Sequence, residues 1–246
     1  MILAAVQYKP PKGDSQVARR QLSSFVQKAA ENSADIIVCP EMAVSGYIWE
    51  NPAELRPHAE PANGKTFQML SPIAKKYKSW VVCGIAETDG DLLYNSAIVI
   101  SSTGELVCCY RKILLYEADY KWATKGDTRM LVHTEYGVLA PAICMDLNDN
   151  NLLYWLWQNK PDILVFCTNW LDEGSSIDEY WRMRTQHWDG WMIGANCWGE
   201  DCGTKFRGES AILDREKITR VKAPIAGNHI IYWDTLKGAC HSKSDS

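Results

Sequence analysis

The sequence predicts an α/β fold with a mixed β-sheet, on three observations. Short apolar runs of strand length alternate with segments of helical spacing near both ends of the chain, which is typical of α/β proteins. In the middle, two strand-like runs flank a glycine turn, as in an antiparallel hairpin. A length of 246 residues, with 46% hydrophobic and 23% charged residues, suits one globular domain. We therefore predict a single domain over residues 1–246, with a polar tail at about 240–246.

The first third of the chain predicts three strands and two helices. Residues 35–39 are apolar throughout, which favours a strand covered on both faces. Ser15 is expected to cap a helix, because apolar residues recur near helical spacing after it. Residues 42–61 are expected to form a loop with short turns. Strands are predicted at 2–7, 35–39 and 80–86, and helices after Ser15 and over 66–77.

The rest of the chain begins with the hairpin and then returns to alternating strands and helices. Gly104 is expected in the hairpin turn between 95–100 and 105–111. Residues 112–127 are polar and predicted to be irregular. Further strands are predicted at 138–143, 163–167, 192–196, 210–213, 220–223 and 229–233, and helices at 152–158 and 176–188.

Composition and charge exclude several classes of function. The formal net charge is −4, so no basic footprint for nucleic acid or an anionic membrane is expected. The first residues lack the basic region of a signal peptide, and no apolar run approaches the roughly 18 residues of a membrane helix. We therefore expect a cytoplasmic protein whose nine cysteines are thiols. No C-x-x-C pair occurs, so no metal site is expected.

Three expected strands end at residues that could carry chemistry together: Glu41, Lys112 and Cys144. A carboxylate can take the proton of a thiol, the thiolate can attack a carbonyl carbon, and an ammonium can stabilise the negative charge that develops. The residue types alone are equally consistent with a solvated glutamate, a surface lysine and a buried thiol.

The amino-acid sequences around these three residues resemble motifs of the nitrilase superfamily, the carbon–nitrogen hydrolases. Pro40-Glu-Met-Ala-Val-Ser-Gly-Tyr47 is similar to the glutamate motif of that family, Tyr110-Arg-Lys-Ile-Leu-Leu-Tyr116 to its lysine motif, and Ala142-Ile-Cys-Met-Asp-Leu147 to its cysteine motif. The motifs occur in family order, and the opening strand, Tyr94-Asn-Ser96 and Ala195-Asn196 also fit. The resemblance implies a four-layer α-β-β-α sandwich.

The resemblance also implies a role for each motif residue. Glu41 would be the general base, Cys144 the nucleophile, and Lys112 would lie beside the tetrahedral intermediate. The backbone N–H of Met145 would complete the oxyanion hole. No metal or organic cofactor is implied, the partner is a small-molecule amide, and a homo-oligomer is expected.

The sequence departs from the family pattern at several positions. The second active-site glutamate of the family is expected seven residues after Lys112, where this chain has Asp119; we favour Asp119 for that role, with Glu117 as the alternative. The nucleophile is followed by Met145, where many family amidases have tyrosine. His187 occupies the position of a structural glutamate and is interpreted as a structural histidine on a helix.

Aromatic residues suggest how the pocket is lined. The chain has 11 tryptophans, most of which we attribute to core and interface packing. Trp170 is the best pocket candidate because it follows a strand end, Asn169 could present its amide to the substrate, and Tyr47 is a further candidate. Together these features predict a hydrolase of a linear amide or carbamoyl amine that forms a thioester on the cysteine. The alternatives are a true nitrilase, disfavoured by Cys-Met-Asp at the nucleophile, and an inactive binding or assembly module.

Overall fold

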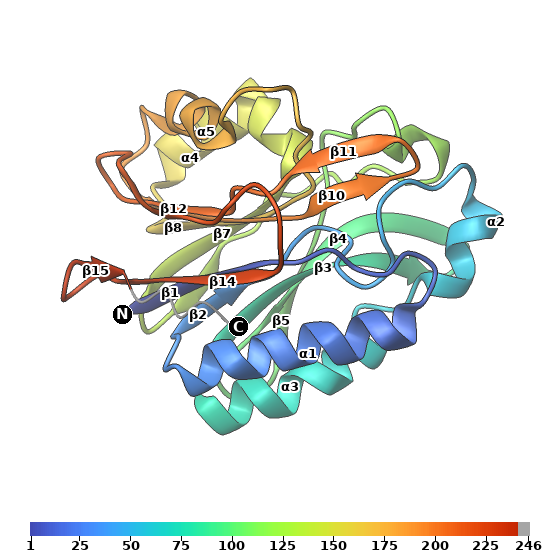
Figure 1. Cartoon of the computed structure of the whole chain (residues 1–246), viewed down its shortest axis with the longest axis horizontal. Helices are drawn as coiled ribbons and strands as arrows, with labels where there is room; N and C mark the ends of the chain where they lie inside the picture. The colour runs from blue at the N-terminus through green and yellow to red at the C-terminus, as the bar shows by residue number, and fades with distance from the viewer. Residues whose placement is uncertain (241–246) are drawn as a thin grey trace.

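Two β-sheets lie face to face in the computed structural model, which describes residues 1–240 (Figure 1). The first sheet has the strand order β15-β14-β1-β2-β3-β4-β5 and the second β13-β12-β9-β8-β7-β6. The strands of the first sheet are β1 Ile2–Gln7, β2 Ile36–Val38, β3 Trp80–Asp89, β4 Leu92–Ile100, β5 Leu106–Arg111, β14 His229–Asp234 and β15 Ala239–Cys240. Those of the second are β6 Val132–Thr134, β7 Gly137–Ile143, β8 Ile163–Thr168, β9 Trp191–Asn196, β12 Ala211–Leu213 and β13 Thr219–Lys222. A separate hairpin pairs β10 Trp198–Asp201 with β11 Thr204–Arg207.

Helices cover the outer face of each sheet, so the molecule has four layers (Figure 1). The helices α1 and α3 lie against the first sheet, and α4 and α5 against the second. This is the α-β-β-α sandwich that the resemblance implied. The helices are α1 Ser15–Glu31, α2 Pro52–Leu55, α3 Lys65–Tyr77, α4 Asn150–Asn159 and α5 Ile177–Thr185, with short 3-10 turns η1 Arg56–His58, η2 Asp119–Lys121 and η3 Cys144–Asn148.

Alternating side chains on the strands produce three packed layers of core. In β8, Ile163 and Val165 point between the two sheets, whereas Leu164 and Phe166 point towards α4 and α5. All four side chains are buried, which explains why the run is apolar throughout instead of alternating with polar residues.

The parallel strands place the sequence motifs at one edge of the sandwich. β1, β2 and β3 are parallel neighbours, and so are β7, β8 and β9. β5 returns in the direction of β3 because two antiparallel pairings separate them. The segments that follow β2, β5, β7 and β8 therefore meet at the same edge, which brings the predicted site residues together.

Gly84 allows the backbone of β3 to approach the turn that carries Glu41. A Cβ atom at Gly84 would lie 2.5 Å from the Cα of Glu41 and 2.5 Å from the carbonyl oxygen of Pro40. The Gly84 N–H donates to that same oxygen (3.1 Å), and the Gly84 carbonyl accepts from the Ala43 N–H (2.9 Å). Because these are backbone atoms, they cannot move aside as the end of a flexible side chain would.

We expect Gly84→Ala to destabilise the protein by about 1–3 kcal/mol, the usual cost of overpacking, and to displace Glu41. Denaturant unfolding measures the first effect, and kcat/KM measures the second. Gly13→Ala is the control: a Cβ there meets nothing within 4 Å, so it should leave kcat/KM unchanged although its positive φ of 76° costs some stability. Unchanged kcat/KM in Gly84→Ala would contradict the prediction.

Several sequence predictions of local structure are wrong. Asp14, not Ser15, caps α1: its carboxylate accepts from the Val17 N–H (3.0 Å), and Ser15 is the first helical residue. The strands β6, β10, β11 and β15 were not predicted. Cys240 belongs to β15 and not to the predicted tail, whose residues 241–246 lie outside the described part of the chain.

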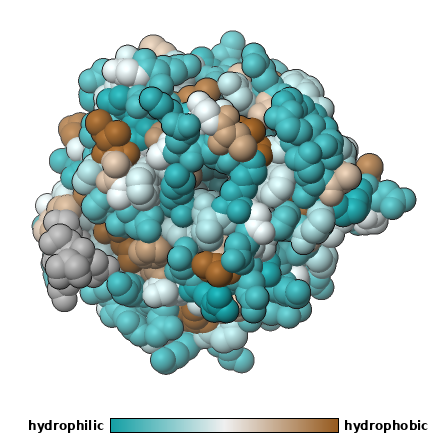
Figure 2. Space-filling model, turned by 45° about the vertical axis from the view of Figure 1, so that its right-hand side comes forward, coloured by the Kyte–Doolittle hydropathy of each residue, from teal (hydrophilic) through white to brown (hydrophobic). Residues whose placement is uncertain are grey.

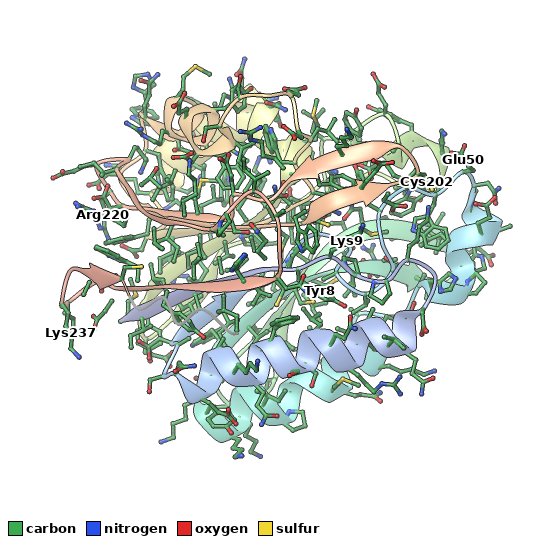
Figure 3. The ribbon with its side chains drawn as sticks, in the orientation of Figure 1. Tyr8, Lys9, Glu50, Cys202, Arg220 and Lys237 are labelled. Atoms are coloured by element: carbon green, nitrogen blue, oxygen red, sulfur yellow. The ribbon has the colours of Figure 1, made fainter. Side chains whose placement is uncertain are left out.

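The surface holds two of the cysteines. Cys202 and Cys240 are exposed, and Cys202 lies at the turn of the β10–β11 hairpin (Figure 3). All nine cysteines are free in the structure, and Cys39, Cys83, Cys167 and Cys197 are buried as expected for small core residues. Hydrophilic side chains dominate the face shown in Figure 2, where hydrophobic ones form small scattered groups. Within residues 1–240, no helix combines the length and apolar character needed to cross a membrane.

Candidate active site

Glu41 lies in the turn after β2, fully removed from solvent. Its Oε1 accepts from the Lys112 ammonium (2.7 Å) and from the Asn95 side-chain amide (2.7 Å), and its Oε2 accepts from the Asn169 backbone N–H (2.8 Å). Burial raises the pKa of Glu41 and the neighbouring Asp119 raises it further, while Lys112 and Asn95 oppose the increase. The carboxylate is therefore a stronger base than an exposed glutamate, and three donors hold it in position.

Lys112 lies between two carboxylates in the fully buried region behind the pocket. Its ammonium donates to Glu41 Oε1 and to Asp119 Oδ2 (2.6 Å). Burial by itself would lower the pKa of Lys112, but the charges of Asp119 and Glu41 outweigh it, so the pKa lies well above its usual value. The residue therefore stays an ammonium. The ring of Tyr47 lies over it, with the centroid 5.5 Å from Nζ.

Asp119 takes the place beside the lysine, and Glu117 does not. Asp119 is buried in η2; its Oδ2 also accepts from the Tyr116 N–H (2.9 Å), and its Oδ1 accepts from the Asn95 side-chain amide (3.2 Å). Glu117 is exposed. The aspartate reaches Lys112 from the first residue of η2, after a turn in which the Asp119 N–H donates to the Tyr116 carbonyl (2.9 Å).

Cys144 is the first residue of η3 and directly follows the last residue of β7. Its φ of 42° is in the left-handed region, which is unusual for a residue with a side chain and is characteristic of functional turns. Burial raises the pKa of its thiol to about 12; the charge of Glu41 adds to the increase and Lys112 opposes it. The resting side chain is therefore a thiol, and it needs a base to become a nucleophile.

Asp146 fixes the cysteine turn against the lysine segment, a role that sequence reasoning missed. Its carboxylate is fully buried and accepts from the Tyr110 hydroxyl (2.7 Å) and from the N–H groups of Ile113 (3.0 Å), Leu114 (2.8 Å) and Ile143 (3.0 Å). Burial raises the pKa of Asp146, although these hydrogen bonds oppose the shift. One carboxylate thus joins segments that follow β5 and β7, which belong to different sheets.

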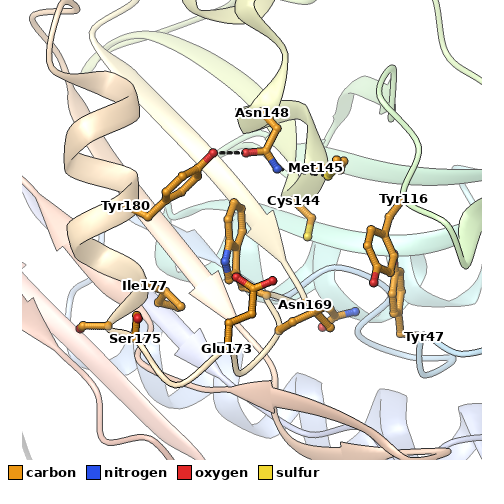
Figure 4. Close-up of a pocket in the computed structure, with 13 residues that line it drawn as sticks. Tyr47, Tyr116, Cys144, Met145, Asn148, Asn169, Glu173, Ser175, Ile177 and Tyr180 are labelled. Atoms are coloured by element: carbon orange, nitrogen blue, oxygen red, sulfur yellow. Dashed lines mark hydrogen bonds between the residues drawn. The ribbon is translucent and has the colours of Figure 1, made fainter.

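A cavity of about 380 Å³ opens at the Cys144 turn (Figure 4). This size is typical of a site for a small molecule. Five predicted residues line it, whereas Glu41, Lys112 and Asp119 are buried beside it and outside its lining. The lining residues are Tyr47, Tyr116, Cys144, Met145, Asn148, Asn169, Trp170, Leu171, Glu173, Ser175, Ser176, Ile177 and Tyr180.

The nitrogen and the oxygen of the Asn169 side-chain amide have different surroundings. Its side-chain nitrogen donates to the backbone oxygen of Glu41 (3.0 Å), so this group holds the glutamate turn and is not presented to a substrate. Its Oδ1 and the Tyr47 hydroxyl are buried without a hydrogen-bond partner among the described residues. These two oxygens are therefore the groups of Asn169 and Tyr47 that remain available to a bound molecule.

The structure also shows where the tryptophans and His187 lie. Trp170 lines the cavity, while Trp49 and Trp122 pack in a buried cluster beside the site and Trp157 is 54% exposed. His187 is exposed in the turn after α5, so the interpretation as a structural helix histidine is wrong. Arg184, on α5 itself, donates to the Leu147 carbonyl (3.0 Å) and so supports η3.

Sequence reasoning named Asn95 only as part of a supporting motif and did not single out Glu173, Tyr116 or Tyr180. Asn95 could have been singled out, since it occupies the motif Tyr94-Asn-Ser96 in the strand beside the lysine strand. The loop residue Glu173 offers no such signal, because its place depends on how the chain runs between β8 and α5. Within residues 1–240 no group of side chains that could hold a metal ion is found.

Comparison with known proteins places this geometry in a family. A family model described as carbon-nitrogen hydrolase matches residues 2–233. A probable nitrilase of Schizosaccharomyces pombe is 30% identical over 218 residues, covering 86% of this chain and 79% of that protein. The protein N-terminal amidase of the same organism is 26% identical, covering 87% and 91%.

The fold agrees with a solved structure of a more distant protein. A variant of the amidase from Nesterenkonia sp. AN1 superposes with a TM-score of 0.85 at 17% sequence identity, covering 95% of this chain and 92% of that one. At this identity the likeness concerns the fold alone. The family model spans all three motifs and nearly every strand of both sheets, and we conclude that the chain belongs to the nitrilase superfamily of carbon–nitrogen hydrolases.

Proposed function

We propose that the protein is an amidase that hydrolyses the C–N bond of a linear amide or carbamoyl amine through a thioester on Cys144. The observation that carries this proposal is the position of the Cys144 thiol: it opens on a cavity of substrate size while Glu41 and Lys112 are buried directly behind it. The relatives named as amidases support the same class of reaction.

The proposed reaction has two stages. Glu41 takes the thiol proton as Sγ bonds to the amide carbon; the tetrahedral intermediate then collapses, and Glu41 gives the proton to the departing ammonia or amine as the C–N bond breaks. In the second stage water attacks the thioester, Glu41 takes the proton of the water, and the proton returns to sulfur when the C–S bond breaks.

Each remaining group has a part in this scheme. Lys112 and the backbone N–H of Met145 stabilise the oxyanion, and neither needs to reorganise during the reaction. Asp119 holds the Lys112 ammonium in place, so the second carboxylate positions the lysine and does not itself react. Asn95 donates to both carboxylates and so holds each of them in position.

An ammonia-release screen across linear amides, carbamoyl amines and nitriles tests the proposal. We expect release from amides or carbamoyl amines, together with an acyl adduct on Cys144 in intact-mass and peptide spectra of reactions stopped during turnover. Release from nitriles alone would replace the proposal with a nitrilase. No release from any class would leave the protein as a binding or assembly module.

The pH profile of kcat/KM gives a second test of the mechanism. Glu41 must be ionised to take the thiol proton, and its pKa lies above the ordinary value of 4.5. We therefore expect activity to fall as the pH drops through an acidic limb whose midpoint is higher than 4.5, and to stay level through pH 9, because the thiol does not ionise until about pH 12. A rise in activity near pH 9 would indicate that free thiolate, not the Glu41–thiol pair, is the reacting form.

A further inference from the structure

Glu173 is a carboxylate in the cavity that the proposed mechanism does not use. It lies in the loop between β8 and α5 and lines the same cavity as Cys144. Figure 4 shows its side chain reaching towards the middle of the cavity, with Tyr180 on one side and Tyr116 on the other. Among residues 1–240, the structure gives this carboxylate no hydrogen bond or ion pair. Its negative charge is therefore available to a bound molecule.

The charge in and around the cavity is mainly negative. The lining residues, all within the described part of the chain, include no lysine, arginine or histidine. The ammonium groups of Lys112 and Lys222 lie next to the lining, and each is paired with two carboxylates. Lys112 is bonded to Glu41 and Asp119, so this buried cluster is itself negative when both carboxylates are ionised. Lys222 donates to the Ser176 hydroxyl (2.8 Å) but also pairs with Asp178 (2.9 Å) and Glu209 (3.5 Å). Glu173 is exposed and adds an unpaired negative charge to the lining. A cation is attracted into such a cavity and an anion is repelled.

Aromatic rings complete a site for a cation. Trp170 packs against Tyr180 with their ring centroids 5.5 Å apart, and the Tyr180 hydroxyl is held by Asn148. Tyr116 and Tyr47 line the cavity on the side opposite Tyr180 in Figure 4. Ring faces attract ammonium groups, and the attraction is larger in a partly desolvated place than on an open surface.

We propose that Glu173 binds a positively charged group at the end of the acyl chain remote from Cys144, so that the preferred substrates are small linear amides that carry an ammonium. This inference rests on the proposed function and narrows its substrate class. Glu173 thereby discriminates against amides with a carboxylate at the same position, because two like charges would meet in the cavity.

Three amides of matched length test the inference. The ammonium compound is 5-aminopentanamide, hexanamide replaces the ammonium by a methyl group, and 4-carbamoylbutanoate carries a carboxylate. We expect the wild type to prefer the ammonium compound over hexanamide by about tenfold in kcat/KM, the range of a charge-assisted contact that is partly exposed, and to use the carboxylate compound least. The preference should shrink as ionic strength rises.

Variants separate the role of Glu173 from a general effect on the enzyme. Glu173→Gln should lose most of the preference for 5-aminopentanamide, chiefly through a higher KM for that compound, while kcat/KM for hexanamide should change much less. Glu173→Lys should reverse the order of the two charged compounds. Glu179→Gln is the matched control, because Glu179 is an exposed acid on α5 that lines a different cavity, and it should retain the wild-type order.

Binding to a Cys144→Ala variant, measured by calorimetry with the same three compounds, distinguishes the two proposals. Preferential binding of 5-aminopentanamide without turnover in the wild type would keep Glu173 as the residue that binds the ammonium group and overturn the amidase. Turnover of all three amides in an order that Glu173→Gln leaves unchanged would overturn the inference and keep the amidase. Equal binding of the three compounds, in the absence of turnover, would overturn both.

Discussion

Replacing Cys144 with alanine is expected to reduce kcat/KM for amide hydrolysis by roughly 10⁴-fold or more, the scale found when the nucleophile of a covalent mechanism is removed. In the proposed mechanism the sulfur bonds to the acyl carbon in the first stage and leaves it in the second, and a methyl group in its place can do neither. The fold should be little affected, because the change removes one atom from a side chain at the edge of the cavity.

Cys108→Ala is the matched control for this variant. Cys108 is another buried thiol, in β5, whose pKa burial raises to about 11, and it lies in the core between the sheets. It should keep wild-type kcat/KM within a small factor and still form the adduct on Cys144. A Cys144→Ala enzyme that retains more than a few per cent of the activity would mean that a different residue attacks the substrate.

Replacing Lys112 with methionine is expected to abolish activity and to lower the free energy of unfolding by about 3–5 kcal/mol, the range for breaking a buried ion pair from one side. Because methionine fills much of the same volume as lysine, the change in activity and in the free energy of unfolding measures the loss of the charge. Without the ammonium, Glu41 and Asp119 face each other unpaired in a site that excludes water, and one of them must take up a proton to relieve the repulsion.

A second variant and a control make this prediction specific. Lys112→Met combined with Asp119→Asn removes one of the two unpaired carboxylates, so it should recover part of the stability without recovering activity. Lys121→Met breaks an ion pair with Glu50 in which both side chains are largely exposed, and should change stability by less than about 0.5 kcal/mol. Denaturant unfolding measures all three. Equal losses for Lys112→Met and Lys121→Met would contradict the electrostatic account.

The sequence was sufficient for most strands and helices because most core strands carry a local apolar pattern. Hairpin β10–β11 has no such pattern, since only Phe206 of its strands is buried. Its pairing is local, across the two-residue turn Cys202–Gly203, so the missed signal was the turn itself. The cap of α1 differed by one residue because Asp14 and Ser15 are both good caps, and only the three-dimensional course of the chain decides between them.

Some residues of the candidate site could be predicted from the sequence and others could not. Glu41, Lys112 and Cys144 were predictable because each lies in a local motif at a strand end. Asp146 was not, although it is part of the cysteine motif, because its importance comes from donors that lie more than thirty residues away in the sequence. Asp119, which was favoured over Glu117, lies beside Lys112, and the turn from Tyr116 to Asp119 precedes it.

The face-to-face sheets have a consequence for the folding of the protein. Glu41 and Lys112 follow strands of one sheet, while Cys144 follows a strand of the other. A chain in which only one sheet has formed therefore positions either Cys144 or the Glu41–Lys112 pair, but not both. The proposed chemistry requires that the two sheets are docked, because only then does the thiol lie beside the carboxylate proposed to activate it.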